Sequence, residues 1–289
     1  MAHYDTQYTT IAEPVPPPPP GVQSRARWPL ASAMALDLII IIVAVLILTT
    51  VVTGIFVGVR AASQHIPLIQ LRSMGQTQLL RLMGVDGIFA ALLIQNAIFV
   101  ATPMLRVAVI RREPLAEIGF QARNLGRLAR FGLGLGVLVL IGNVTLGYLF
   151  SQAGIEQNQA DQYPLFKGDY LGQAAFFVGA AVVAPLGEEV LFRGYVFNAM
   201  RLTFQFRSWG LPAAYLVSAL LFMAAHALAA TQGLIGLLIP TFLMGLLLAW
   251  GMHRTGSLIP GIIAHALNNS VGLITLILYI NNPGSFPKP

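Results

Sequence analysis

Two adjacent glutamates lie within a long apolar segment of this 289-residue chain, and an arginine follows four residues after the second. They are Glu188 and Glu189 of APLGEEVLFRG (184–194), and the arginine is Arg193. On a helix of about 3.6 residues per turn, Glu189 and Arg193 share one face and can form an ion pair, while Glu188 is rotated by about 100°. Glu188 is therefore available for a different role.

Two histidines and an asparagine occur in the hydrophobic segments that follow. FMAAH (222–226) places Phe222 and His226 on one helical face, and HALNN (265–269) does the same for His265 and Asn269. An ionisable side chain near the bilayer centre costs roughly 2.5–3.5 kcal/mol and usually faces the bundle interior. Taken singly, each residue is most simply a helix–helix hydrogen bonder or a member of a structural ion pair. Taken together on three helices, they predict one shared site.

Several familiar protease chemistries are missing from the sequence. The chain has no cysteine, no HExxH motif and no GxSxG motif, and the Gly-Asp at 168–169 supplies only one aspartate where an aspartyl dyad needs two. The net charge of +6 comes from arginines clustered in loops between hydrophobic segments, so it does not indicate nucleic-acid binding. What remains is chemistry carried by carboxylate, imidazole and amide groups.

Composition predicts an all-α, polytopic transmembrane helix bundle. The chain is 56% hydrophobic and 10% charged, against about 25% charged in soluble domains. We expect seven spans, and eight is the alternative because the fourth apolar segment is long and interrupted at 185–187. The expected spans are 34–59, 88–110, 131–151, 173–203, 211–231, 234–252 and 258–281.

The chain is expected to divide into three parts. Residues 1–30 contain the proline run EPVPPPPPG (13–21) and are predicted to form a disordered cytoplasmic tail. Residues 31–160 are predicted to supply peripheral N-terminal transmembrane helices with a basic loop, and residues 165–283 the catalytic transmembrane domain with the polar site on the last four spans.

The distribution of arginines predicts the orientation. Six arginines between 106 and 130 surround one loop, whereas the 152–169 loop carries three acids and one lysine. Because cytoplasmic loops are enriched in Lys and Arg, we expect a cytoplasmic N-terminus, in a bacterial cytoplasmic membrane. Arg60, Arg72 and Arg81 lie on the wrong side for this rule, and the last two belong to a segment (66–84) expected to form a helix on the membrane surface.

The polar motifs resemble those of the CPBP family of intramembrane glutamic proteases, formerly called the Abi family, which includes the type II CAAX prenyl endopeptidases related to Ras-converting enzyme. EEVLFRG (188–194) matches the family's Glu-Glu-x-x-x-Arg motif. Phe222 and His226 match Phe-x-x-x-His, and His265 and Asn269 match His-x-x-x-Asn or Asp. The resemblance covers about residues 170–281.

The resemblance implies an intramembrane endopeptidase that acts on a membrane-anchored or lipidated substrate, such as a prenylated CAAX-type protein. Glu188 and His226 would activate a water molecule, and His265 and Asn269 would stabilise the oxyanion. Glu189, Arg193 and Phe222 would support these groups. The expected partners are membrane lipids and the substrate, with no nucleic acid; the sequence does not determine the oligomeric state.

Three alternatives stay open at this stage. We expect a site without a metal or other cofactor, but Glu188, His226 and His265 could ligate Zn²⁺ or Mn²⁺. A proton-coupled membrane transporter would also explain buried ionisable groups. A non-catalytic scaffold or bacteriocin-immunity protein of the same fold is the third alternative. An unpaired buried carboxylate at Glu188 argues against a scaffold, and an Asn one turn after a His favours the protease over the transporter.

Overall fold

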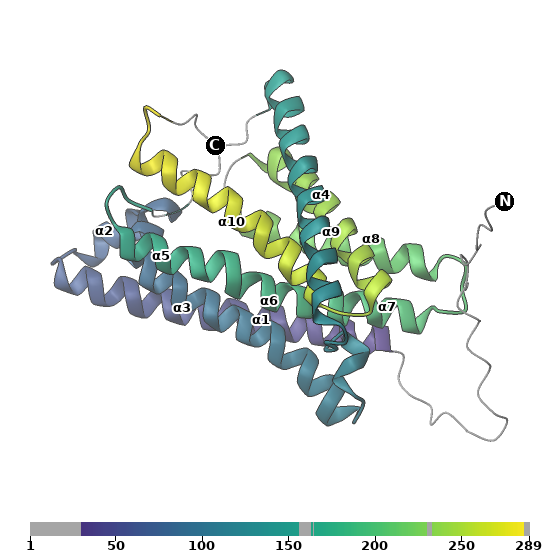
Figure 1. Ribbon diagram of the computed structural model, residues 1–289. Helices are drawn as coiled ribbons and strands as arrows, with labels where there is room; N and C mark the ends of the chain where they lie inside the picture. Colours follow the sequence, from purple (N-terminus) through teal and green to yellow (C-terminus); the bar gives the residue numbers. More distant parts are fainter. Residues whose placement is uncertain (1–29, 156–162, 164, 230–232, 286–289) are drawn as a thin grey trace, which may run out of the picture.

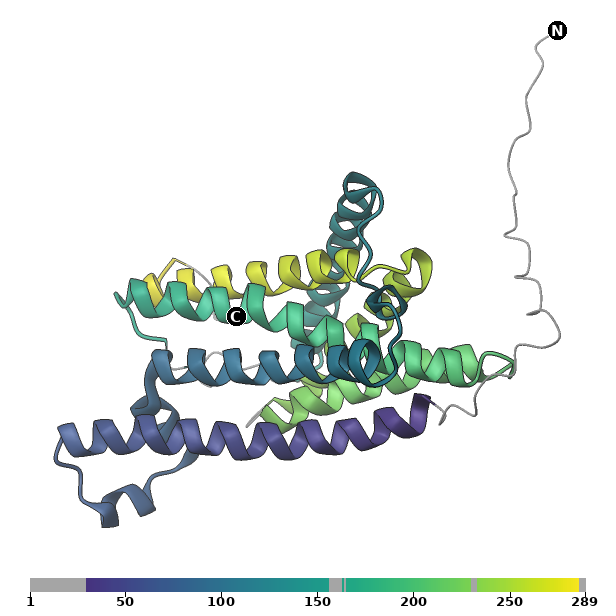
Figure 2. The same ribbon diagram turned by 90° about the horizontal axis from the view of Figure 1, so that it is seen from below.

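The computed structural model describes residues 30–155, 163, 165–229 and 233–285 as a bundle of helices, with no strand within these ranges. Seven helices in this part of the chain are long and apolar enough to cross a membrane, which confirms the predicted all-α transmembrane bundle. Figures 1 and 2 show α10, the fourth span, α3 and α1 running side by side, with α4 crossing them steeply.

The helix boundaries follow the hydrophobic segments of the sequence. The spanning helices outside the fourth span are α1 (Leu30–Ser63), α3 (Gln76–Met104) continued by η1 (Leu105–Ile110), α4 (Leu125–Gln152), α8 (Gly210–Ala229), α9 (Leu234–Thr255) and α10 (Ile259–Asn281). Two short helices lie between them, α2 (Leu68–Ser73) and η2 (Leu115–Ile118).

The fourth span is one continuous helical rod, Tyr170–Thr203, and we call it the central rod. Its segments are α5 (Tyr170–Val178), η4 (Gly179–Val183), α6 (Ala184–Glu188), η5 (Glu189–Phe197) and α7 (Asn198–Thr203). Pro185 lacks an N–H and would clash with a carbonyl one turn earlier. The wide π-helical turn η4 directly precedes it and accommodates this misfit, so the helix continues through the proline.

The central rod is the most buried of the seven spans. In its most apolar window 56% of residues are buried, against 6% for α1. It lies between α3 on one side and α10 on the other (Figure 2). The predicted polar motifs of the rod are thereby enclosed on both sides.

A buried charged cluster joins the N-terminal helices to the central rod. Arg106 donates two hydrogen bonds to the carboxylate of Asp37 on α1, at 2.7 and 2.5 Å, and the Tyr195 hydroxyl donates to the same carboxylate. Arg106 was assigned from sequence to the basic loop, but its side chain points into the bundle, where it neutralises Asp37.

The segment 66–84 also differs from the expected single surface helix. Its first half forms α2, and the chain then turns at Met74 and Gly75 before α3 begins. Within α3 the backbone breaks at Gly84, whose φ of 70° is a left-handed conformation that glycine adopts readily. The predicted tail and the acids Glu156 and Asp161 lie outside the described residues.

Candidate active site

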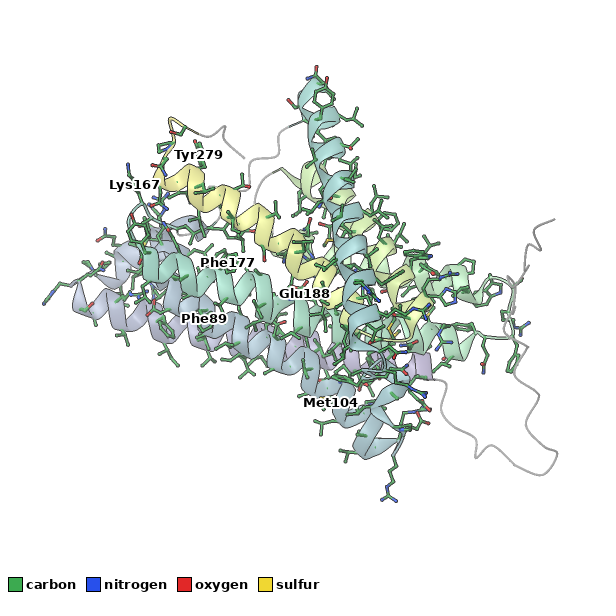
Figure 3. The ribbon with its side chains drawn as sticks, in the orientation of Figure 1. Phe89, Met104, Lys167, Phe177, Glu188 and Tyr279 are labelled. Carbon is green, nitrogen blue, oxygen red and sulfur yellow. The ribbon has the colours of Figure 1, made fainter. Side chains whose placement is uncertain are left out.

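The adjacent glutamates lie where two segments of the central rod meet, since Glu188 ends α6 and Glu189 begins η5. Figure 3 places Glu188 at mid-length of the bundle, away from Lys167 and Tyr279 at one end. Turns of π-helix recur at functional sites. Here they flank the glutamates on both sides.

Glu189 and Arg193 form the expected ion pair. The Arg193 Nη1 donates to Glu189 Oε1 at 2.8 Å, and both side chains are fully buried. Gly261 on α10 makes room for the carboxylate, because a Cβ there would lie 2.6 Å from Glu189 Oε2. The close approach of α10 therefore depends on a glycine opposite Glu189.

Phe222 on α8 connects the ion pair to both histidines. The Arg193 guanidinium lies over the Phe222 ring, with its carbon 4.1 Å from the centroid, which is a cation–π contact. The rings of His226 and His265 meet the same phenylalanine edge-on, at 4.6 and 5.6 Å between centroids. The aromatic residue of the Phe-x-x-x-His motif thus holds three polar groups together.

His265 on α10 contacts both glutamates. Its Nδ1 lies 3.1 Å from Glu189 Oε1, and because a carboxylate oxygen accepts, this nitrogen is the donor. The other ring nitrogen, Nε2, faces Glu188 Oε2 at 3.7 Å, beyond hydrogen-bond distance. His265 is therefore anchored on Glu189 and presents its second nitrogen to Glu188.

His226 reaches the cluster through Phe222, and no described contact joins it directly to Glu188. Its Nδ1 lies 2.9 Å from the Phe222 carbonyl oxygen. A carbonyl can only accept, so Nδ1 carries the proton and the neutral ring keeps a free lone pair on Nε2. This is the tautomer that a proton acceptor needs.

Asn269 lies one turn beyond His265 on α10 and docks that helix on the central rod. Its Nδ2 donates to the Ala180 carbonyl of η4 at 2.9 Å. Neighbouring Asn268 points toward α4, where its Oδ1 accepts from Asn143 at 2.7 Å. The structure thus distinguishes the two asparagines, although Asn269 makes no described contact with Glu188.

Four buried polar atoms in the described part of the chain have no hydrogen-bond partner: Asn96 Oδ1, Glu188 Oε2, Glu189 Oε2 and Arg193 Nε. Buried polar groups are normally satisfied, so such a concentration indicates a place for water or a ligand. Three of the four belong to predicted site residues.

Asn96 on α3 is a further polar residue beside the site that the sequence analysis missed. Its side chain packs against Gly187, immediately before Glu188, where a Cβ would lie 2.1 Å from Asn96 Oδ1. An asparagine inside an apolar span is itself a visible signal. It lies outside the last four spans, on which the site was predicted.

The residues of the metal-binding alternative do not form a metal cage. In the described ranges no group of three His, Cys, Asp or Glu side chains stands close enough to hold a metal ion. Glu188 and His265 approach each other, but His226 is turned onto the Phe222 carbonyl. The structure thus brings together two of the three residues of the metal-binding alternative, and a site without a metal stays a prediction.

Comparison with known proteins identifies the segment that carries the site. The family model of Rce1-like type II CAAX prenyl endopeptidases matches residues 170–271, which include every predicted site residue. An uncharacterized 24.3 kDa protein of Escherichia coli is 34% identical over 93 residues, which are 32% of this chain and 40% of that relative. No solved structure matches the chain. Residues 170–271 of this multi-pass membrane protein are therefore similar to a domain of the Rce1-like type II CAAX prenyl endopeptidase kind, which supports membership of the CPBP family.

Proposed function

We propose that this protein is an intramembrane endopeptidase of the glutamic type, which hydrolyses a peptide bond near the lipidated end of a CAAX-type substrate without a metal ion. The observation that carries the proposal is the buried Oε2 of Glu188, which has no hydrogen-bond partner within the described chain although an imidazole lies 3.7 Å away. An unpaired carboxylate oxygen inside a bundle is suited to accept a proton from water. Glu189, by contrast, is held by Arg193 and His265.

In the proposed reaction, Glu188 and the free Nε2 of His226 orient a water molecule, and Glu188 takes its proton as the water oxygen attacks the scissile carbonyl carbon. The carbonyl oxygen becomes an oxyanion, and the carbon–nitrogen bond then breaks. The proton held by Glu188 passes to the departing amine. No acyl-enzyme forms, because the attacking atom is the oxygen of water.

We assign oxyanion stabilisation to His265 and Asn269. His265 donates from Nδ1 to Glu189, so Nε2 can donate only when the ring carries both protons. Asn269 uses one Nδ2 hydrogen on Ala180 and keeps the second for the oxyanion. Donors fixed on a packed helix stabilise developing charge effectively.

The proposal is tested with purified full-length protein in liposomes and a fluorogenic CAAX-type peptide, prenylated or unprenylated. Wild type should release the C-terminal fragment of the prenylated peptide, and Glu188→Gln should release none. Equal cleavage of the unprenylated peptide would show that the enzyme does not require a lipidated substrate. If wild type cleaves neither peptide but carries protons across the liposome membrane, the transporter alternative is correct.

We further propose a bacterial cytoplasmic membrane location with the N-terminus in the cytoplasm, supported by the arginines near the η2 loop. Single cysteines at Arg123 and Lys167, which are exposed on opposite loops, can be labelled with an impermeant reagent in intact cells, because the chain has no native cysteine. We expect labelling at 167 and none at 123. The reverse pattern would invert the orientation.

A further inference from the structure

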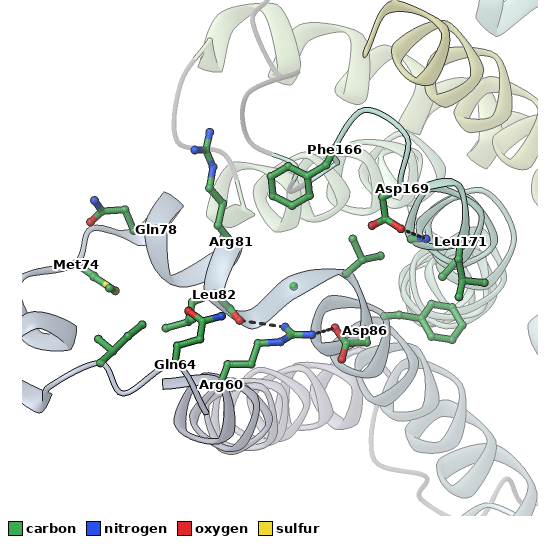
Figure 4. A pocket seen from close by; sticks show the side chains of 16 residues that line it. Arg60, Gln64, Met74, Gln78, Arg81, Leu82, Asp86, Phe166, Asp169 and Leu171 are labelled. Atoms are coloured by element: carbon green, nitrogen blue, oxygen red, sulfur yellow. Dashed lines mark hydrogen bonds and ion pairs between the residues drawn. The ribbon is translucent and has the colours of Figure 1, made fainter. Parts of the chain in front are cut away.

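A cavity of about 790 Å³ opens at the end of the bundle that holds α2, and its lining includes none of the predicted site residues (Figure 4). It is lined by the last turns of α1, the first part of α3 and the beginning of α5. Its volume falls in the range of about 300–1,000 Å³ that is typical of small-molecule sites. The proposed protease reaction makes no use of it.

The length of α1 supports a position for the cavity near the surface of the bilayer. α1 has 34 residues and is about 51 Å long, which exceeds a hydrocarbon core of about 30 Å, so at least one of its ends extends past that core. Leu171 of the cavity lining is 84% exposed, and Ile69 on α2, the helix between the lining residues Ile66 and Met74, is 81% exposed. Such side chains suit contact with lipid chains beside a polar headgroup.

The first arginine at the cavity, Arg60, is already neutralised. It pairs with Asp86 at 2.5 Å and donates to the carbonyl oxygens of Leu82, at 3.0 Å, and Met83. These carbonyls precede the helix break at Gly84, so Arg60 satisfies backbone acceptors that the break leaves open. Arg60 is therefore a structural element of the cavity wall.

The remaining charges at the cavity have opposite signs and are placed apart. Arg81 is exposed and has no partner in the described chain, and Figure 4 shows it extending away from Arg60. Asp169 lies across the opening beside Leu171, where its Oδ1 caps α5 by accepting from the Gly172 N–H at 3.0 Å. Because Asp86 is already paired with Arg60, the cavity offers one unpaired cation, Arg81, and the carboxylate of Asp169.

We propose that this cavity binds the headgroup of a phospholipid that carries both a phosphate and a primary amine, such as an ethanolamine phospholipid. Arg81 would hold the phosphate, and Asp169 would accept a hydrogen bond from the ammonium group. Charge-assisted hydrogen bonds of this kind are the strong ones. A choline headgroup has no N–H to donate, and a glycerol headgroup has no cation for the carboxylate. The proposal also gives a role to Arg81, which lies on the side of the membrane where few arginines are expected.

The test measures which lipids stay bound to the full-length protein after transfer to detergent, by native mass spectrometry. The protein is first equilibrated with equal amounts of ethanolamine, choline and glycerol phospholipids that have identical acyl chains. We expect the ethanolamine lipid to be retained about tenfold over the other two, in keeping with one charge-assisted contact. Arg81→Gln and Asp169→Asn should each remove most of this preference.

The variants have matched controls. Asn caps helices as well as Asp does, so Asp169→Asn should leave α5 intact. Arg72→Gln changes an exposed arginine on α2 that does not line the cavity, and it should keep the wild-type preference. Equal retention of the three lipids by wild type, or loss of preference in Arg72→Gln, would overturn the proposal. If soluble glycerophosphoethanolamine competes equally strongly for the cavity, the ligand is a soluble molecule and not a lipid.

Discussion

Two clusters of charged side chains lie inside the spanning helices, and they differ in how completely their hydrogen bonds are satisfied. In the first cluster both oxygens of Asp37 accept hydrogen bonds, two from Arg106 and one from Tyr195. In the second, around Glu188 and Glu189, each glutamate has a buried oxygen with no partner among the described residues. We therefore assign the first cluster to helix packing, and we propose that the second receives another molecule.

The largest effect is expected from removing the cation of the second cluster. Arg193→Ala leaves the buried Glu189 charge without its ion pair and removes the cation–π contact with Phe222. We expect a loss of about 3–5 kcal/mol in stability and loss of turnover, measured by thermal unfolding in detergent and by peptide cleavage. Arg254→Ala, at an exposed position, is the control and should leave both unchanged. An Arg193→Ala protein as stable as wild type would contradict the anchoring role.

A smaller effect is expected at the proposed oxyanion donor. Asn269→Ala should lower kcat by about 10²–10³-fold, the usual loss when one such donor is deleted. Asn268→Ala is the matched neighbour; it faces Asn143 on α4 and should change kcat by less than tenfold. The measurement is kcat of each variant on the prenylated peptide, from steady-state kinetics. Equal losses would mean that Asn269 acts only by docking α10 on Ala180.

The contact between α3 and the rod predicts a packing effect of intermediate size. Gly187→Ala places a Cβ 2.1 Å from Asn96 Oδ1 and 2.9 Å from Asn96 Cβ, so the helices must move apart. We expect about 1–3 kcal/mol of destabilisation, with reduced turnover because Glu188 is the next residue. Adding Asn96→Ala relieves the collision and should restore part of the stability. If the double variant's loss of stability equals the sum of the losses in the two single variants, the two positions are not coupled.

The smallest effect is expected from removing metal ions. Because we propose that water is activated by Glu188 and His226 alone, prolonged chelation should leave turnover within experimental error. The measurement is cleavage before and after chelator treatment, followed by addition of Zn²⁺ or Mn²⁺. If activity disappears and one of these ions restores it, Glu188, His226 and His265 are metal ligands.

The sequence predicted those features that depend on local spacing. Hydropathy located all seven spans, and the interval between Glu189 and Arg193 predicted an ion pair that the structure contains. The division of the chain at 1–30, 31–160 and 165–283 stays a prediction.

Features that depend on distant contacts could not be predicted in this way. Asp37 lies 69 residues from Arg106 and 158 from Tyr195, and no local pattern connects them. The acceptor for Asn269 is the backbone carbonyl of Ala180, which any residue type would provide. Whether Pro185 ends the fourth span or lies within it depends on packing around the rod.

The contrast between the clusters is tested most directly by one paired experiment on Glu188→Gln and Asp37→Asn. Turnover and thermal unfolding are measured on the same preparations, with turnover taken well below the unfolding temperature. Glu188→Gln should unfold as wild type does and show no turnover, because its shape is kept while the basic oxygen is lost. Asp37→Asn should unfold at a lower temperature and still cleave the peptide. Full cleavage by folded Glu188→Gln would contradict the account.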